Sequence, residues 1–285
     1  MDNLYNETKS IMKKYGIYAN KSLGQNFLID ENVVESIVNS ANITKEDLVI
    51  EIGPGLGTLT KELLKKAGKV ICIELDEKMI KILQDRFENL EVINNDVLKV
   101  DLNSLINEER CKTSIQSAKI VANLPYYITT PIIMKLLEEK LNIESITVMI
   151  QKEVADRLVS LPGEKLSGAI TYSVYYYATA EKILEVPNNS FIPEPEVTSE
   201  VIKLNLRKEV PIKVEDEKLL FKIIKLAFMQ RRKTLVNALS NGNLFESKEQ
   251  IYKMLKELEI NEKIRGEALT LEQYAEITNW IIDNI

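Results

Sequence analysis

The sequence contains no histidine among its 285 residues, and this absence removes several kinds of active site. Without an imidazole there is no Ser-His-Asp triad, no Cys-His pair, no histidine general base and no histidine-based zinc site. Only two cysteines occur, Cys72 and Cys111, too few for an all-cysteine zinc site or for a framework of disulfides. We therefore expect an intracellular protein without a metal centre.

Long apolar runs are missing as well, and glycine and proline are scarce. No stretch approaches the roughly 18 apolar residues that a membrane span needs, and the N-terminus has no basic segment followed by an apolar one. We expect a cytoplasmic protein that does not bind membranes. The 37 basic and 43 acidic residues give a net charge of −6. This charge argues mildly against a nucleic-acid partner, because domains that bind nucleic acid are usually basic.

What the sequence does contain is an alternation of short β-branched runs with helical periodicity. Strands are predicted over residues 48–52, 70–75, 92–93, 120–122 and 146–150. Helices are predicted over residues 31–42, 58–67, 79–87 and 131–140. Such alternation is typical of βαβ units in a parallel sheet covered on both faces. The sequence therefore predicts an α/β fold of the doubly wound type.

Residues 168–206 complete the predicted α/β domain. Residues 183–186 and 201–206 are predicted closing strands, and the loop 191–199 between them is stiffened by two prolines. Residues 168–178 are ambiguous, because their composition favours a strand while their apolar spacing also fits a helix.

The pattern changes near residue 207, beyond which no strand is predicted. Helices are expected over residues 219–239, 251–258 and 271–284. A length of 285 residues corresponds to roughly two domains at about 150 residues each. We therefore predict an α/β domain with an N-terminal arm over residues 1–206 and a small all-helical domain over residues 207–285.

Three chemically informative features follow predicted strands. The glycines of Gly53–Gly57 let the backbone approach a ligand closely, although their spacing is G-x-G-x-G and not the dinucleotide fingerprint. Glu74 lies about 20 residues beyond, where an acid can accept both ribose hydroxyls. Asp96 can bind an adenine amino group. Taken singly, a tight turn, a solvated carboxylate and a helix cap are the simpler interpretations, but together they indicate an adenosine-containing cofactor.

The segment Asn123–Tyr126 follows the fourth predicted strand. The Asn123 side chain cannot ionise, so it is no general base, but its oxygen and the Leu124 carbonyl can accept hydrogen bonds from an amino group. Pro125 fixes the turn, and the ring of Tyr126 can stack on a flat base. A strand-ending turn with a buried tyrosine is the simpler interpretation of the bare tetrapeptide. Its place beside the other strand ends favours a site for an exocyclic amine.

In these motifs the chain resembles the ribosomal RNA adenine dimethyltransferase family of the KsgA type. The N-terminal segment Lys21–Asp30 resembles the family's cofactor motif, and Glu51–Gly57 resembles its glycine loop. Asn123–Tyr127 resembles its catalytic motif. Phe191–Ser199 and Gln230–Leu235 resemble its target loop and tail signature. Five motifs in the family's order form a specific match over residues 20–275.

The resemblance implies an S-adenosylmethionine-dependent methyltransferase of class I, with a Rossmann-like, mostly parallel seven-stranded sheet. The residues that it assigns to the cofactor pocket are Asn26, Leu28, Gly53, Glu74, Asp96 and Asn123. Among them, Glu74 would hold the ribose and Asp96 the adenine. Asn123 and the Leu124 carbonyl would hold the target amine, and Tyr126 and Phe191 would stack on the target base.

The implied reaction is N6,N6-dimethylation of two adjacent adenosines near the 3′ end of small-subunit rRNA, carried out by a monomer during ribosome maturation. Three alternatives stay open. One is a large-subunit rRNA adenine methyltransferase of the antibiotic-resistance type, and another is an assembly factor or RNA-binding module without catalysis. A nicotinamide dehydrogenase is disfavoured by the spacing of the glycines and by Asn123–Tyr126. The basic cluster Arg231–Lys233 is either a contact to rRNA phosphates or a solvated helix face with salt bridges.

Overall fold

The computed structural model describes residues 3–19 and 24–285, so the segment 20–23 at the start of the N-terminal motif lies outside the described residues. The chain forms two compact units. Unit 1 runs up to Ala155 and resumes over Ala180–Leu206, whereas unit 2 combines Asp156–Thr179 with Arg207–Ile285. Unit 2 thus includes all of the expected helical domain over residues 207–285 and also a segment, Asp156–Thr179, that we had assigned to the first domain.

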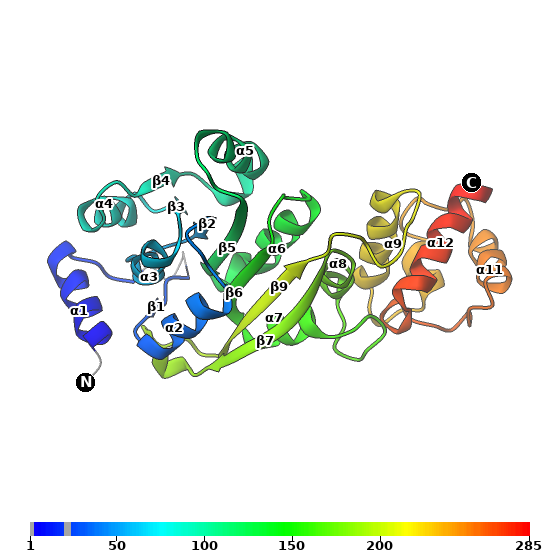
Figure 1. The fold of residues 1–285 in the computed structure, drawn as a ribbon. Helices are drawn as coiled ribbons and strands as arrows, with labels where there is room; N and C mark the ends of the chain where they lie inside the picture. The colour runs from blue at the N-terminus through cyan, green and yellow to red at the C-terminus, as the bar shows by residue number, and fades with distance from the viewer. Residues whose placement is uncertain (1–2, 20–23) are drawn as a thin grey trace. The chain divides into compact units, whose positions relative to one another are not determined.

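A seven-stranded sheet runs through unit 1 (Figure 1). In spatial order its strands are β4 (Glu91–Asn94), β3 (Lys69–Glu74), β2 (Asp47–Ile52), β5 (Ser117–Asn123), β6 (Ser145–Gln151), β9 (Ser199–Leu206) and β7 (Ala178–Val186). The strands from β4 to β6 pair in parallel, and β9 runs antiparallel to β6. The predicted doubly wound, mostly parallel fold is confirmed. The order of strands reverses at β2, where ligands bind in folds of this class.

In unit 1, two helices precede the first strand of this sheet and the others alternate with its strands along the chain. They are α1 (Asn3–Tyr15), α2 (Glu31–Ser40), α3 (Thr58–Lys66), α4 (Glu77–Arg86), α5 (Leu102–Lys112) and α6 (Thr129–Glu138), while α7 (Lys152–Val159) crosses from unit 1 into unit 2. Two short strands, β1 (Phe27–Leu28) and β8 (Phe191–Ile192), pair antiparallel in a sheet of their own. We had not predicted α5 and α7. Asp101 caps α5 by accepting a hydrogen bond from the backbone N–H of Ser104.

Alternation of side chains along the strands explains why the sheet is buried on both sides. Val49, Cys72 and Val121 belong to a buried cluster that also contains apolar residues of α2 and α3. The intervening Ile50 and Ile71 are fully buried as well. Because successive strand residues point to opposite faces, both faces are covered, as a parallel sheet between helices requires.

Apart from the first two residues of β7, the regular structure of unit 2 is helical within the described residues. Its main helices are α8 (Ala169–Tyr177), α9 (Glu217–Met229), α10 (Leu235–Leu239), α11 (Lys248–Glu257) and α12 (Leu271–Asn284). The ambiguous segment is therefore a helix. Tyr172 of α8 packs against Phe228 and Tyr274, with ring centroids 5.5 and 5.2 Å apart, and donates a hydrogen bond to the Leu269 carbonyl. These contacts explain why Asp156–Thr179 belongs to unit 2.

One expected helix of unit 2 is interrupted. The prediction of a continuous helix over residues 219–239 is wrong, because α9 ends at Met229 and Gln230 has a non-helical backbone. The basic cluster Arg231–Lys233 therefore lies in the connection between two helices and not on a helix face. No helix in the described part of the chain combines the length and apolar character of a membrane span.

Candidate active site

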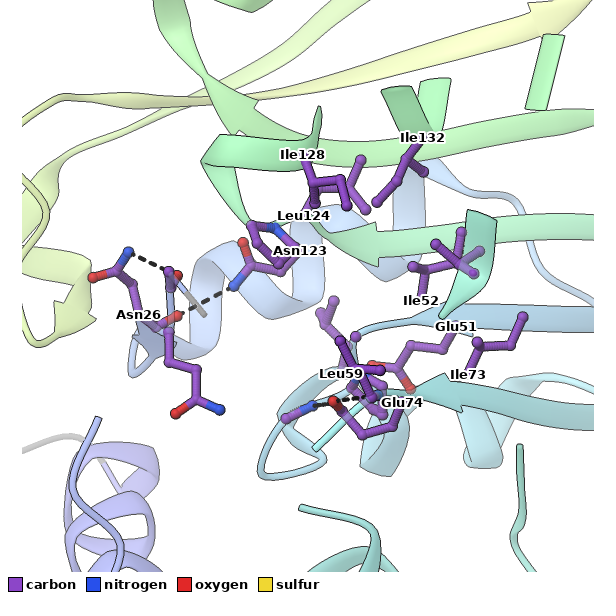
Figure 2. Close-up of a pocket in the computed structure, with 18 of the residues that line it drawn as sticks. Asn26, Glu51, Ile52, Leu59, Ile73, Glu74, Asn123, Leu124, Ile128 and Ile132 are labelled. Atoms are coloured by element: carbon purple, nitrogen blue, oxygen red, sulfur yellow. Dashed lines mark hydrogen bonds between the residues drawn. The ribbon is translucent and has the colours of Figure 1, made fainter. Parts of the chain in front are cut away.

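A cavity opens at the carboxyl ends of the central parallel strands of unit 1 (Figure 2). Eight of the nine site residues predicted from the sequence line it, namely Asn26, Leu28, Gly53, Glu74, Asp96, Asn123, Leu124 and Tyr126. They come from segments far apart in the sequence, which the parallel arrangement of β2 to β5 brings to one edge. The predicted grouping of strand-end residues is therefore found in the structure.

Glu74 ends β3 and is held by backbone amides. One carboxylate oxygen accepts hydrogen bonds from the N–H groups of Leu75 and Asp76, at 2.8 and 2.9 Å, and the other accepts one from Gly55 at 3.3 Å. Burial raises the pKa of this carboxyl, and the three amides oppose that shift. The side chain is 9% exposed, so a fixed carboxylate faces the cavity beside the glycine loop.

The glycine loop between β2 and α3 is shaped by left-handed backbone conformations at Gly53, Gly55 and Gly57, with φ of 65°, 56° and 81°. Such values favour glycine because a side chain adds steric strain. A Cβ built on Gly53 would meet no atom within 4 Å. Gly53 therefore borders open space in the cavity wall, where a ligand can approach the backbone closely. The Glu74 carboxylate can accept hydrogen bonds from sugar hydroxyls, and the open edge at Gly53 leaves room for a ligand against the backbone. Together they suit an adenosine-containing cofactor.

Asn123 ends β5 on the other side of the cavity from Glu74 (Figure 2). Its side-chain nitrogen donates a hydrogen bond to the Asn26 carbonyl at 3.4 Å. This bond orients the amide so that nitrogen faces the N-terminal segment. The carbonyl oxygen of the same amide is then the atom available to accept a hydrogen bond from an amine. Tyr126 and Tyr127 follow on the same wall, and Tyr127 is 58% exposed.

Comparison with known proteins relates this site to one family. Residues 16–283 match the model of the family described as Ribosomal RNA adenine dimethylase. The chain belongs to the ribosomal RNA adenine dimethylase family. This match confirms the resemblance, the enzyme class and the rRNA-modifying function that we inferred from the sequence.

Members of the dimethylase family resemble this chain over nearly its whole length. Ribosomal RNA small subunit methyltransferase A of Alkaliphilus metalliredigens is 51% identical over 275 residues, which are 95% of each chain. The protein of the same name from Clostridioides difficile is 47% identical and covers 99% of this chain and 98% of its own. A dimethyladenosine transferase from Plasmodium falciparum has a similar structure, with a TM-score of 0.72 and 26% identity over 90% of this chain and 98% of that one.

A second solved structure has a similar fold. The structure of the 23S rRNA methyltransferase ErmE superposes with a TM-score of 0.64 at 23% identity, over 90% of this chain and all of that one. At this identity the likeness concerns the fold. The likeness to these two solved structures confirms the predicted class I methyltransferase fold.

Asp96 and Leu28 each stabilise local structure and also line the cavity. Asp96 caps the short helix Val97–Lys99 by accepting a hydrogen bond from the Leu98 N–H at 3.0 Å, and it also lines the cavity. The cap and ligand interpretations are therefore compatible. Leu28 is 3% exposed and lies in β1, where it pairs with Phe191 of β8.

Phe191 departs from the sequence prediction. It is 1% exposed, belongs to the buried cluster that contains Leu28, and is absent from the cavity lining. Because β1 pairs with β8, Phe191 lies next to Leu28, and Leu28 is the residue of this pair that lines the cavity. In this conformation Phe191 supports the wall of the site and offers no stacking face to a base.

Glu51 is a lining residue to which the sequence analysis gave no role of its own. It lies inside β2, is 1% exposed, and accepts hydrogen bonds from the Thr60 hydroxyl at 2.5 Å and the Cys72 thiol at 3.5 Å. Burial raises the pKa of its carboxyl to about 7. The sequence signal for Glu51 was a single acidic residue among the apolar residues of the predicted strand 48–52. No cluster of metal-ligating side chains is found in the described ranges.

Proposed function

We propose that this chain transfers methyl groups from S-adenosylmethionine to N6 of two adjacent adenosines near the 3′ end of small-subunit rRNA. One observation carries the proposal: the Asn123 amide, suited to an amine, and the Glu74 carboxylate, suited to a ribose, line the same cavity. The names of the relatives in Alkaliphilus metalliredigens and Clostridioides difficile support the small subunit as the target.

The cofactor would be held along the edge formed by the glycine loop. In this proposal Glu74 accepts hydrogen bonds from the ribose hydroxyls, and Asp96 accepts one from the adenine amine. The open edge at Gly53 lets the ligand lie close to the protein backbone. Asn26, Leu28 and Asn123 complete the pocket. When bound, S-adenosylmethionine supplies an activated methyl group on a sulfonium.

The target base would be held by Asn123, the Leu124 carbonyl and Tyr126. The lone pair of an adenine amine is delocalised into the ring, so the amine is a poor nucleophile. Two acceptors aimed at it, the Asn123 oxygen and the Leu124 carbonyl, favour a pyramidal nitrogen with a localised lone pair. Positioning and electrostatics are then the main contributions of the protein. The amine becomes acidic only after methylation, so its proton can leave to water, which fits a chain without histidine.

The base must leave its stack to reach such a pocket, and an aromatic face offsets part of that cost. We assign this face to Tyr126, which lines the cavity. Phe191 was the second candidate from the sequence. Its burial in the core suggests that it acts instead by supporting Leu28.

Contacts to the remaining rRNA are proposed for the helical tail over residues 207–285, and in particular for Arg232 and Lys233. Both are exposed, and within the part of the chain that the structure describes neither has an ion-pair partner. Arg231 differs, since it pairs with Glu267. Phosphate contacts of this kind weaken as salt rises. We further propose that the enzyme acts as a cytoplasmic monomer.

The test is transfer of labelled methyl from S-adenosylmethionine to purified unmodified small subunits, with large subunits and naked rRNA in parallel and the products mapped. We expect two dimethylated adenosines in small-subunit RNA and loss of transfer in Asn123→Ala. Glu62→Gln is the control: this residue of α3 is partly exposed, pairs with Lys65 and does not line the cavity, so the variant should retain activity. Labelling confined to large-subunit RNA would move the chain to the resistance type. Cofactor binding without transfer to any substrate would favour a non-catalytic assembly factor.

A further inference from the structure

Helix α1 is tied to the wall of the cofactor pocket by one acidic side chain. The two carboxylate oxygens of Glu7 lie 2.6 Å from Arg86 Nη2 at the end of α4 and 2.8 Å from Lys61 Nζ on α3. In Figure 1 α1 is the dark blue helix near α3 and α4. The side chains of Glu7 and Arg86 are 26% and 15% exposed, so this pair is less exposed than the ion pairs that the lysines of α3 make with Glu7 and Glu62.

Arg86 also contacts the glycine loop. Its second terminal nitrogen, Nη1, donates a hydrogen bond to the carbonyl of Leu56, the residue between Gly55 and Gly57. The guanidinium also lies over the ring of Phe87, 5.0 Å from its centroid. One planar guanidinium therefore joins an N-terminal helix to the backbone of the loop that borders the cavity.

Apolar contacts accompany the polar ones. The Leu56 side chain is 2% exposed and lies in a small cluster with Phe27 and Met79. Three residues from α1, Ile11, Met12 and Tyr15, pack against this cluster. The glycine loop is thus covered by α1 through both a hydrogen-bonded ion pair and a group of apolar side chains.

The loop needs such external contacts because its own side chains fix it weakly. Three of its five residues are glycines with positive φ, and glycine has the largest conformational freedom to lose on ordering. Inside the loop the Gly57 N–H donates to the Pro54 carbonyl at 2.9 Å. The hydrogen bond from Arg86 to the Leu56 carbonyl adds a second restraint on the loop, just before α3 begins.

We propose that Glu7 and Arg86 are positioning residues for cofactor binding, with α1 acting as a clasp that holds the glycine loop in its ligand-accepting conformation. Glu7 neutralises and orients the Arg86 guanidinium, and Arg86 in turn fixes the Leu56 carbonyl. Neither residue lines the cavity. The inference rests on the proposed function in one respect, that the ligand of this loop is S-adenosylmethionine.

The test compares S-adenosylmethionine affinity by calorimetry in the wild-type protein and in Glu7→Ala and Arg86→Gln. We expect both variants to bind roughly tenfold more weakly, because a loop that samples other conformations binds in proportion to its competent fraction. Lys61→Gln removes the other partner of Glu7 and leaves the contact to Leu56, so it should stay within about twofold of wild type. In methyl transfer the loss should appear in the KM for the cofactor, with kcat retained at saturation.

Hydrogen exchange without cofactor separates local positioning from general destabilisation. The clasp predicts faster exchange of the Gly55 and Gly57 amides in Glu7→Ala, with the amides of β5 and β6 unchanged. Wild-type affinity in both variants together with unchanged loop exchange would overturn the proposal, as would faster exchange throughout the sheet. If the wild-type protein failed to bind S-adenosylmethionine, the proposed function would be wrong, and loop exchange would still decide whether the clasp exists.

Discussion

The hydroxyl oxygens of Tyr126 and Ser199 lie 2.7 Å apart in a hydrogen bond. Tyr126 ends the Asn-Leu-Pro-Tyr segment after β5, and Ser199 is the first residue of β9. The bond therefore joins two motifs that lie more than 70 residues apart in the sequence. It fixes the far end of the Tyr126 ring, so the face presented to the cavity is preorganised.

This arrangement predicts different outcomes for two substitutions of Tyr126. Tyr126→Ala removes the stacking face and should lower the single-turnover rate of methyl transfer roughly 10- to 100-fold, the range of base–aromatic stacking. Tyr126→Phe keeps the ring and loses one hydrogen bond, so the fall should be less than about tenfold. Ser199→Ala is the matched control and should equal Tyr126→Phe. Equal rates in the Ala and Phe variants would contradict a stacking role.

The sequence predicted that these strand-end residues would border one cavity, because each of the features it used is local. A β-branched run followed by Gly53, or ending at Glu74, identifies both the strand and its last residue. The parallel pairing that the alternation of strands and helices implies then brings these ends together. The grouping of Asn123 with Glu74 needed no knowledge of distant contacts beyond that topology.

Features that depend on distant pairing were missed. Phe191 is buried because two residues of β8 pair with two residues of β1, more than 160 positions earlier, and no local pattern reports such a pair. The helical state of α8 rests on Tyr172 packing against Phe228 and Tyr274. Tertiary packing of this kind overrides a composition that favours strands.

The buried carboxyl of Glu51 predicts a specific pH dependence of stability. Its pKa is raised from 4.5 to about 7 in the folded protein, so the folded state binds more protons than the unfolded state between these values. The free energy of unfolding should therefore fall as pH rises from about 4.5 to about 7, by about 3 kcal/mol from this group. Cofactor-free wild-type protein and Glu51→Gln should be compared by urea unfolding across this window.

The difference between the two proteins isolates Glu51 from other titrating groups. Asp47 has a lowered pKa caused by its hydrogen bonds to Lys119, Ser117 and Thr44, which outweigh burial. Its contribution is lost only as pH falls below about 4, outside the window. A difference between wild type and Glu51→Gln that does not change with pH would contradict the assignment.

Two glycines of the same loop should respond differently to alanine. At Gly57 a new Cβ would lie 2.4 Å from the Phe87 ring and 2.9 Å from Leu83, so overpacking adds to backbone strain and the unfolding free energy should fall by about 3 kcal/mol. At Gly53 the Cβ meets nothing within 4 Å, which leaves strain alone, about 1 kcal/mol. Gly53→Ala should instead weaken S-adenosylmethionine binding measured by calorimetry. A larger loss of stability in Gly53→Ala than in Gly57→Ala would contradict this assignment of roles.

Substitutions of the adjacent residues Arg231 and Arg232 should have different effects, one on stability and the other on RNA binding. Arg231 Nη2 lies 3.0 Å from Glu267 Oε2 and 3.2 Å from the Ser167 carbonyl, so it joins three segments of unit 2. Because the pair is partly exposed, Arg231→Ala should lower the unfolding free energy by only about 1 kcal/mol. Arg232→Ala, at an exposed side chain, should change the unfolding free energy by less than about 0.5 kcal/mol.

In contrast, Arg232→Ala should weaken small-subunit rRNA binding and reduce the slope of log K against log salt by about 1, since one phosphate contact is lost. Binding titrations at several salt concentrations test this, and an unchanged slope in Arg232→Ala would exclude a phosphate contact at this residue.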